Sequence, residues 1–319
     1  MPKSSKTDVS QSPQSERRFV ERVLCRLGWR ASRGAARVAS SGPNPSSLLA
    51  RFIAANQRLS KATEDRLPAR FKRHIQTLYK HKAAELVNCR TRQIVLDIGG
   101  GKECPFLHFL DAGPEHLIIA LDLSEEQLHR NRQLKHKIVA DAAANRFPFR
   151  DASADLVVSR SVVEHIQDNA AFFANCACVL RPGGIMVHAF PGRYAPFALI
   201  NQLLPNRIAR RLVGYLHPEW LEEDNYGFLA FYDRCYFTAI RDLLARNGFE
   251  SYNFVFLYYQ SVYFNFFFPL YILMLGYDLI AASLGIRNLA SGIVVMAKRP
   301  VKLNSCMAAG LTRSFGADD

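Results

Sequence analysis

The sequence predicts an α/β domain in which helices cover both faces of a doubly wound, mostly parallel sheet. Short apolar runs of strand length alternate with longer stretches of helical spacing, and polar or glycine residues directly follow several of the runs. Parallel strands are buried on both faces and are therefore apolar throughout, with helices as their connections. The runs lie at residues 93–98, 116–121, 137–140, 154–159 and 184–190. Ligands of such sheets bind at the carboxyl ends of the strands, so functional residues are expected there.

The length and the charge distribution limit the classes of protein that this chain represents. With 319 residues, of which 49% are hydrophobic, it can form one large domain with a sizeable core. Residues 1–92 hold 20 Lys and Arg against 6 Asp and Glu, a net charge of +14, which leaves −1 for the rest of the total of +13. This basic region lacks the interleaved aromatic and base-reading residues of a nucleic-acid-binding module, so no nucleic acid is expected. An anionic membrane surface would attract it.

The seven cysteines favour a reducing compartment. Their number is odd and no C-x-x-C pair occurs, which argues against a disulfide framework or a zinc site. The first apolar stretch is interrupted repeatedly by arginine, unlike a secretory signal. A cytoplasmic protein is therefore expected, with a mitochondrial presequence as a minor alternative.

Composition and spacing divide the chain into a domain with extensions at both ends. The helical extension shows apolar residues at helical intervals, whereas the tails are rich in small, polar or charged residues. We expect a basic, disordered tail at 1–47, a helical extension at 48–91, the domain at 92–300 with inserts at 192–236 and 258–288, and a second tail at 301–319.

A glycine-rich loop, Asp97–Gly101, follows the first strand and precedes an expected helix. Glycines allow a tight turn and a close approach of the backbone to a ligand, and a helix start offers unpaired N–H groups. A dinucleotide fingerprint would need glycine at Cys104, and a phosphate-binding P-loop would need glycine at Leu96 and Ser or Thr at Glu103. Both are excluded, and an acidic-x-Gly-x-Gly pattern remains.

Acidic residues follow the next two strands. Asp122 ends the second strand, where its two carboxylate oxygens can accept from both hydroxyls of a ribose; the alternative is that it caps a helix at 124–132. Asp141 follows the third strand, where a carboxylate can accept from an adenine amino group and Ala142 can offer its backbone N–H. The three loops together predict a nucleoside-containing ligand.

These elements resemble the class I S-adenosylmethionine-dependent methyltransferases, in particular the type 11 domain. The resemblance rests on the loop at 97–101, on Asp122, on the run Asp141–Ser159 and on the turn Leu180–Gly184. Glu103 stands where many members have a third glycine. The resemblance implies a Rossmann-like fold with a seven-stranded sheet. In that fold, residues 250–257 and 289–297 supply the last two strands as antiparallel neighbours.

The same resemblance implies that S-adenosylmethionine is the cofactor. The Ser159 backbone is expected to face the ammonium group of this cofactor. The residues expected to bind it are Asp97, Gly99, Gly100, Gly101, Asp122, Leu123, Asp141, Ala142 and Ser159.

His165 is the candidate catalytic residue, because its ordinary pKa suits a general base near neutral pH. A base is needed only when the methyl acceptor is a hydroxyl or a protonated amine, and a structural role for His165 is the alternative. Glu164 precedes it, but no further ligand follows at metal-binding spacing, so no metal is predicted. The insert at 192–236 carries four polar residues that we interpret as packed or solvated, His217, Tyr226, Tyr232 and Arg234.

Residues 264–286 form an apolar stretch that is long enough for a transmembrane helix. A crossing would separate the last two strands of the sheet, so the stretch must return to the same side. It is expected to pack on its own domain or to lie in a membrane interface. Residues 196–216 add a basic amphipathic pattern, which indicates peripheral binding to the inner face of an anionic membrane or a hydrophobic lid.

A lipid-linked or other membrane-associated acceptor unites these features. The expected activity is methyl transfer from S-adenosylmethionine to an oxygen of such an acceptor, for example a lipid-linked saccharide. The alternatives are a methyltransferase of a soluble metabolite and a cofactor-binding but non-catalytic assembly protein. The sequence does not predict the acceptor atom or the oligomeric state.

Overall fold

The computed structural model describes residues 48–112, 115–144, 146–217 and 229–301. All of them belong to one compact unit that spans residues 42–319. The predicted tail at 1–47 and residues 302–319 of the second predicted tail lie outside the described residues.

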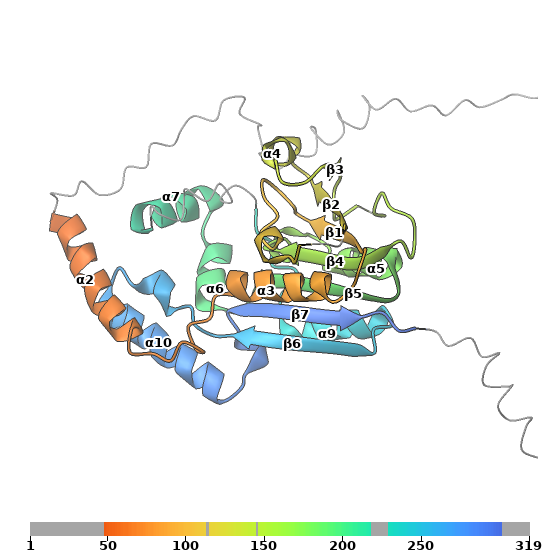
Figure 1. Cartoon of the computed structure of the whole chain (residues 1–319). Coiled ribbons are helices and arrows are strands. Elements are labelled where there is room, and N and C mark those ends of the chain that lie inside the picture. The colour runs from red at the N-terminus through yellow and green to blue at the C-terminus, as the bar shows by residue number, and fades with distance from the viewer. Residues whose placement is uncertain (1–47, 113–114, 145, 218–228, 302–319) are drawn as a thin grey trace, which may run out of the picture. The chain divides into compact units, whose positions relative to one another are not determined.

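A seven-stranded sheet in the order β3-β2-β1-β4-β5-β7-β6 forms the centre of the domain (Figure 1). All neighbouring strands are parallel except β7, which pairs antiparallel with both β5 and β6. The doubly wound, mostly parallel fold and its antiparallel last pair are therefore confirmed. The strands are β1 Ile94–Ile98, β2 Leu117–Asp122, β3 His136–Val139, β4 Ala154–Arg160, β5 Leu180–Pro191, β6 Ser251–Leu257 and β7 Gly292–Lys298.

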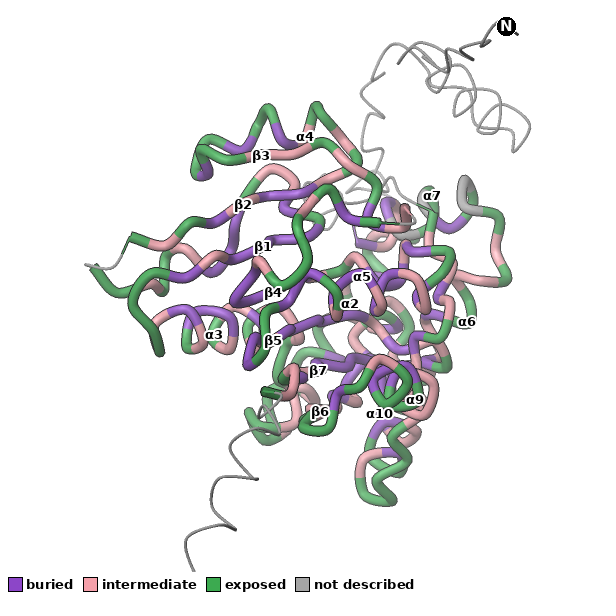
Figure 2. The backbone as a smooth tube through the Cα atoms, turned by 90° about the vertical axis from the view of Figure 1, so that its right-hand side faces the viewer, coloured by how far each residue is buried: buried purple, intermediate pink, exposed green. Residues whose placement is uncertain are grey.

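The central strands are largely buried (Figure 2), and apolar side chains on both faces of the sheet pack against helices. Tyr79 and Val87 of α3 (Ile75–Asn88) pack with Val95 on one face. Phe172 of α5 (Asn169–Val179) and Leu243 of α9 (Phe237–Arg246) pack on the other. Burial on both faces explains why the central strands are apolar along their length.

The remaining α-helices of the described residues are α2 (Leu48–Glu64), α4 (Glu125–Arg130), α6 (Pro196–Leu203), α7 (Asn206–Leu216) and α10 (Phe268–Ser283). The amphipathic stretch at 196–216 is thus two helices. Pro205 separates them, because the residue before a proline is driven out of the helical region, and Leu204 has φ −86° and ψ 136°. None of the helices in the described parts of the chain is both long and apolar enough to cross a membrane.

The prediction of a helix directly after the glycine loop was wrong. The chain there forms only the single 3-10 turn Leu107–Phe109. Pro105 has no N–H to donate, and side chains take the N–H groups on either side of it. Cys104 N donates to Gln133 Oε1 at 2.7 Å, and Asp111 N donates to Asn88 Oδ1 at 3.1 Å. The loop is held by these side chains and not by a helix.

Candidate active site

The predicted cofactor residues lie along one edge of the sheet, at the carboxyl ends of four neighbouring parallel strands. The strands lie in the order β3-β2-β1-β4 (Figure 1). Asp141, Asp122, the loop Gly99–Gly101 and Ser159 therefore follow one another along this edge. Gly99 and Ser159 are 60 positions apart in the chain. Only the parallel pairing of the strands brings them together.

Gly99 and Gly100 are required by the packing of the protein itself. Gly99 has φ +71°, and a Cβ there would lie 2.1 Å from Cγ2 of Val162. A Cβ on Gly100 would lie 2.7 Å from the Cβ of Ala120. The N–H groups of both glycines point to the Leu121 carbonyl, at 2.7 and 3.2 Å. These two glycines therefore fix the loop against the end of β2.

Gly101 differs, because the space beside it is open. The nearest atom to a Cβ at this position would be Asp122 Oδ2, at 3.7 Å. Asp122 Oδ2 also accepts from Gly101 N at 3.0 Å, and Asp122 Oδ1 accepts from Ser124 N at 2.8 Å. Each oxygen still has a second lone pair for a ligand hydroxyl. The alternative in which Asp122 caps the following helix was wrong, since Ser124 caps α4 through Gln127 N.

Asp97 is a buried carboxyl with an unused oxygen. It is 3% exposed, and its Oδ2 has no hydrogen-bond partner in the described part of the chain. Burial raises the pKa of Asp97 to about 7, although the Cys104 thiol and the Arg160 guanidinium oppose the increase. A cationic group that binds beside Asp97 would supply the missing partner and stabilise the carboxylate.

Glu103, the departure from the usual third glycine, pairs with Arg160 at the end of β4. Their closest oxygen and nitrogen lie 3.6 Å apart. Asn131, which follows α4, holds the other side of the loop: its Nδ2 donates to Gly100 O at 3.1 Å, and its Oδ1 accepts from Gln133 N and Leu134 N. Asn131 was not predicted from sequence, because no motif connects it with a loop 30 residues earlier.

The remaining predicted cofactor residues have diverse surroundings. Leu123 is 61% exposed beside Asp122, and Ala142 is buried. Asp141 is exposed and accepts from Ala143 N at 2.7 Å, which closes the turn after β3. Ser159 is fully buried within β4, between Ile98 and His188 in the sheet, and its hydroxyl shares a 2.7 Å hydrogen bond with His188 Nδ1.

A second group of polar residues lies where the chain leaves β4. Glu164 is buried, its Oε2 lacks a hydrogen-bond partner among the residues described, and burial raises its pKa. The Glu164 carbonyl accepts from Phe231 N and Tyr232 N. Tyr232 has φ +52° and Ser161 has φ +54°. Such positive φ values at non-glycine residues often mark functional sites.

His165 is oriented by the same segment. Its Nδ1 lies 2.9 Å from Leu229 O. A carbonyl oxygen only accepts, so Nδ1 is the donor in this contact. The other ring nitrogen, Nε2, lies 3.9 Å from Glu164 Oε1. Of the four insert residues interpreted as packed or solvated, His217 and Tyr232 are buried, and Arg234 pairs with Asp168 and Asp233. Tyr226 lies outside the described residues.

The comparisons with known proteins agree with this geometry. A family model described as a methyltransferase domain matches residues 96–188, which extend from β1 into β5. Residues 96–188 form a domain of the class I S-adenosylmethionine-dependent methyltransferase superfamily. The matched residues include the glycine loop and Asp122, Asp141 and Ser159.

Individual relatives match this chain over only part of their length. A probable S-adenosylmethionine-dependent methyltransferase of Mycobacterium tuberculosis is 34% identical over 124 residues, 39% of this chain and 43% of the relative. A ubiquinone biosynthesis O-methyltransferase of Rhodopseudomonas palustris is 30% identical over 122 residues, 36% of this chain and 47% of the relative. The chain thus spans less than half the length of these relatives. The crystal structure of an S-adenosylmethionine-dependent methyltransferase from Mesorhizobium loti covers 72% of this chain and 100% of its own, with 19% identity and a TM-score of 0.44.

The residues along the edge fit the cofactor of this superfamily, S-adenosylmethionine. Asp97 Oδ2, which is buried and has no partner in the described residues, suits an ammonium group. The carboxylate of Asp122 suits two hydroxyls, and the space beside Gly101 admits a ligand. Exposed Leu123 and the turn at Asp141 offer an apolar side chain and a carboxylate for an adenine. Among the described residues, no group of His, Cys, Asp and Glu could hold a metal ion.

Proposed function

We propose that the protein transfers the methyl group of S-adenosylmethionine to an oxygen of a lipid-linked saccharide or another membrane-associated small molecule. The methyltransferase activity in this proposal rests on two carboxylates at the same edge of the sheet. Asp97 has an oxygen without a hydrogen-bond partner among the described residues, and Asp122 accepts a hydrogen bond from Gly101 N. When bound, the cofactor supplies a sulfonium-activated methyl group, whose transfer needs only an acceptor lone pair held in line with the sulfur.

In this proposal, residues after β4 receive the acceptor. His165 accepts the proton of an acceptor hydroxyl at Nε2, since its Nδ1 is occupied by the Leu229 carbonyl. Glu164 and Tyr232 lie beside His165 in this proposed acceptor site. Asn201 of α6 also borders it, and its Nδ2 lies 3.5 Å from the Tyr232 hydroxyl oxygen. Transfer to oxygen is also the reaction named for the relative from Rhodopseudomonas palustris, a ubiquinone biosynthesis O-methyltransferase.

A membrane-associated acceptor is supported by the helices next to this place. Leu199, Ile200 and Leu203 of α6 are exposed, Leu203 to 83%. Helix α7 carries three arginines and no acidic residue. We therefore propose a cytoplasmic protein that works at the inner face of an anionic membrane.

The test uses S-adenosylmethionine with a labelled methyl group and a lipid extract, and measures the label that enters the organic phase. The wild-type protein is expected to label a lipid. His165→Ala should reduce the rate about a hundredfold with unchanged cofactor affinity, because a general base contributes to the chemical step only.

Asp122→Ala tests the cofactor site by calorimetry. The variant should bind S-adenosylmethionine about tenfold more weakly or worse, because charge-assisted hydrogen bonds are lost. Asp242→Ala, at an exposed position on α9, is the matched control and should bind as the wild type does. Equal affinity in the two variants would refute the ribose assignment. Cofactor binding without label in any lipid or aqueous fraction would favour the non-catalytic assembly protein.

A further inference from the structure

Helix α10 has two faces, and both are apolar. Its inner face packs on the domain through Tyr271 and Leu275, both buried. Its outer face is exposed, with Leu273 at 64% and Ile280 at 59%. The one charged residue between Phe268 and Ser283 is Asp278, which is fully buried. The outer face of α10 is therefore an apolar surface without charge.

Helix α2 extends this surface. Its Ile53, Asn56 and Ser60 form a buried stripe at helical spacing. The last two bind the chain just before and at the start of α10: Asn56 Oδ1 accepts from Phe268 N at 2.8 Å, and Ser60 Oγ donates to Asn265 O at 3.2 Å.

The two exposed faces join where the aromatic rings of α2 and of the residue before α10 stack. The ring centroids of Phe52 and Phe267 are 6.3 Å apart, and both side chains remain more than 40% exposed. Exposed apolar patches of this kind commonly mark interaction sites. We call this the α2–α10 surface and define it by the exposed side chains Leu48, Phe52, Leu59, Phe267, Leu273 and Ile280.

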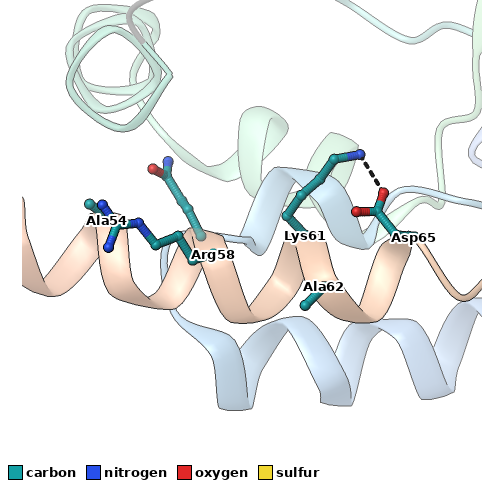
Figure 3. A pocket seen from close by; sticks show the side chains of 6 residues that line it. Ala54, Arg58, Lys61, Ala62 and Asp65 are labelled. Carbon is teal, nitrogen blue, oxygen red and sulfur yellow. Dashed lines mark ion pairs between the residues drawn. The ribbon is translucent and has the colours of Figure 1, made fainter.

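Positive charge accompanies the apolar side chains. Residues 48–74 contain seven Lys and Arg against two acids, a net charge of +5. Both acids, Glu64 and Asp65, lie within 3.1 Å of Lys61. Figure 3 shows the Lys61–Asp65 pair and Arg58 around a shallow hollow on α2. Two copies of the chain would repel each other at such a surface, whereas anionic lipid headgroups would be attracted.

The α2–α10 surface is connected to the acceptor side of the active site. Asp278 Oδ2 accepts from Gln260 N and Ser261 N, at 2.9 and 2.8 Å. Gln260 Oε1 in turn accepts from Phe197 N of α6 at 3.3 Å, and the Phe197 ring stacks on Tyr263 at 4.4 Å. Figure 1 shows α2, α6, α7 and α10 at the end of the sheet where the parallel strands finish. This is the edge that carries the cofactor residues.

We propose that the α2–α10 surface docks onto an anionic lipid bilayer, with its apolar side chains in the interface and the cations of residues 48–74 against the headgroups. The inference deepens the proposed function and rests on its membrane-associated acceptor. Docking through this surface would present α6 and the residues after β4 to an acceptor in the same bilayer. The apolar insert was expected either to pack on its own domain or to lie in a membrane interface. In this proposal it does both, because α10 packs on the domain through one face and contacts lipid through the other.

The test is flotation of the full-length protein with phosphatidylcholine vesicles, with and without phosphatidylglycerol. The wild type should float with the phosphatidylglycerol-containing vesicles, and added salt should weaken the binding. The double variant Leu273→Gln and Ile280→Gln should bind about tenfold more weakly or worse, because the burial of two large apolar side chains is lost. Arg51→Gln with Arg58→Gln should weaken binding to the anionic vesicles only.

The matched control replaces two exposed apolar residues, Leu117→Gln and Val301→Gln. Both lie at the end of the sheet where the parallel strands begin, away from the α2–α10 surface, and this variant should float as the wild type does. The proposal is overturned if the wild type ignores anionic vesicles at low salt, or if the Leu273 and Ile280 variant floats like the control. It is also overturned if light scattering shows a dimer that only this variant dissociates. The labelled-methyl assay separates the two proposals: vesicle binding without methyl transfer retains the docking surface and rejects the proposed activity.

Discussion

Asp97 illustrates how a single residue can couple cofactor binding to pH. In the absence of ligand its buried carboxyl has a pKa of about 7, well above the ordinary value of 3.8. The folded protein then holds a proton that the unfolded chain releases, so the ligand-free protein loses stability as pH rises from about 4 to about 7. An ammonium group, by contrast, binds only to the charged form of the carboxyl.

The affinity for S-adenosylmethionine is therefore expected to fall as pH decreases below about 7, by up to about tenfold per pH unit. Calorimetry across this range would measure it. Asp97→Asn should bind more weakly at pH values above 7 and should lose most of the pH dependence, because the amide does not titrate. A pH dependence that is unchanged in Asp97→Asn would show that another group is responsible. Asp242→Asn, at an exposed position, serves as the control.

At the scale of the element, α10 depends on one buried carboxyl. Asp278 is fully buried, accepts from two backbone N–H groups, and has its pKa raised by burial to about 6. Because the pKa is raised, the contribution of Asp278 to stability is fully present below about pH 4 and is lost as pH rises through about 6. The helix is thus held to the chain after β6 by a group whose charge is costly in this position.

Asp278→Ala should destabilise the protein by about 2–4 kcal/mol, because the N–H groups of Gln260 and Ser261 lose their acceptor in a buried place. Denaturant unfolding would measure the loss, which should be larger at pH 5 than at about pH 8. Ser283→Ala on the exposed side of the same helix should change the stability by less than about 0.5 kcal/mol. Equal losses in the two variants would contradict the role of Asp278.

At the scale of the whole molecule, the cofactor site joins four strands of the sheet and should couple ligand binding to global stability. S-adenosylmethionine at about a hundred times its Kd is expected to stabilise the folded protein by about 2.7 kcal/mol, which raises the Tm by several degrees. Differential scanning calorimetry would measure this shift. Asp122→Ala should lose most of the shift at the same ligand concentration, whereas a full shift in that variant would place the ligand elsewhere.

Much of the fold was predictable, because buried parallel strands must be apolar and their connections are helical. All seven strands lie within two or three residues of their predicted ends, except at the start of β5. The absence of a helix after β1 was not predictable, since it depends on Gln133 and Asn88 taking N–H groups of a distant segment. The break at Leu204 could have been found from Pro205 alone.

The sequence by itself determined which residues are candidates for cofactor binding, because strand ends, glycines and acids at fixed spacing are local features. The tertiary structure decided how they act. It buried Asp97 with one oxygen, Oδ2, that has no hydrogen-bond partner among the described residues. It showed that Gly99 and Gly100 are required by packing whereas the space beside Gly101 is open, and it placed Glu103 beside Arg160. It also joined α2 and α10, which are some 200 residues apart, into one surface. Burial, pairing and exposure depend on contacts between distant segments, and no local pattern contains them.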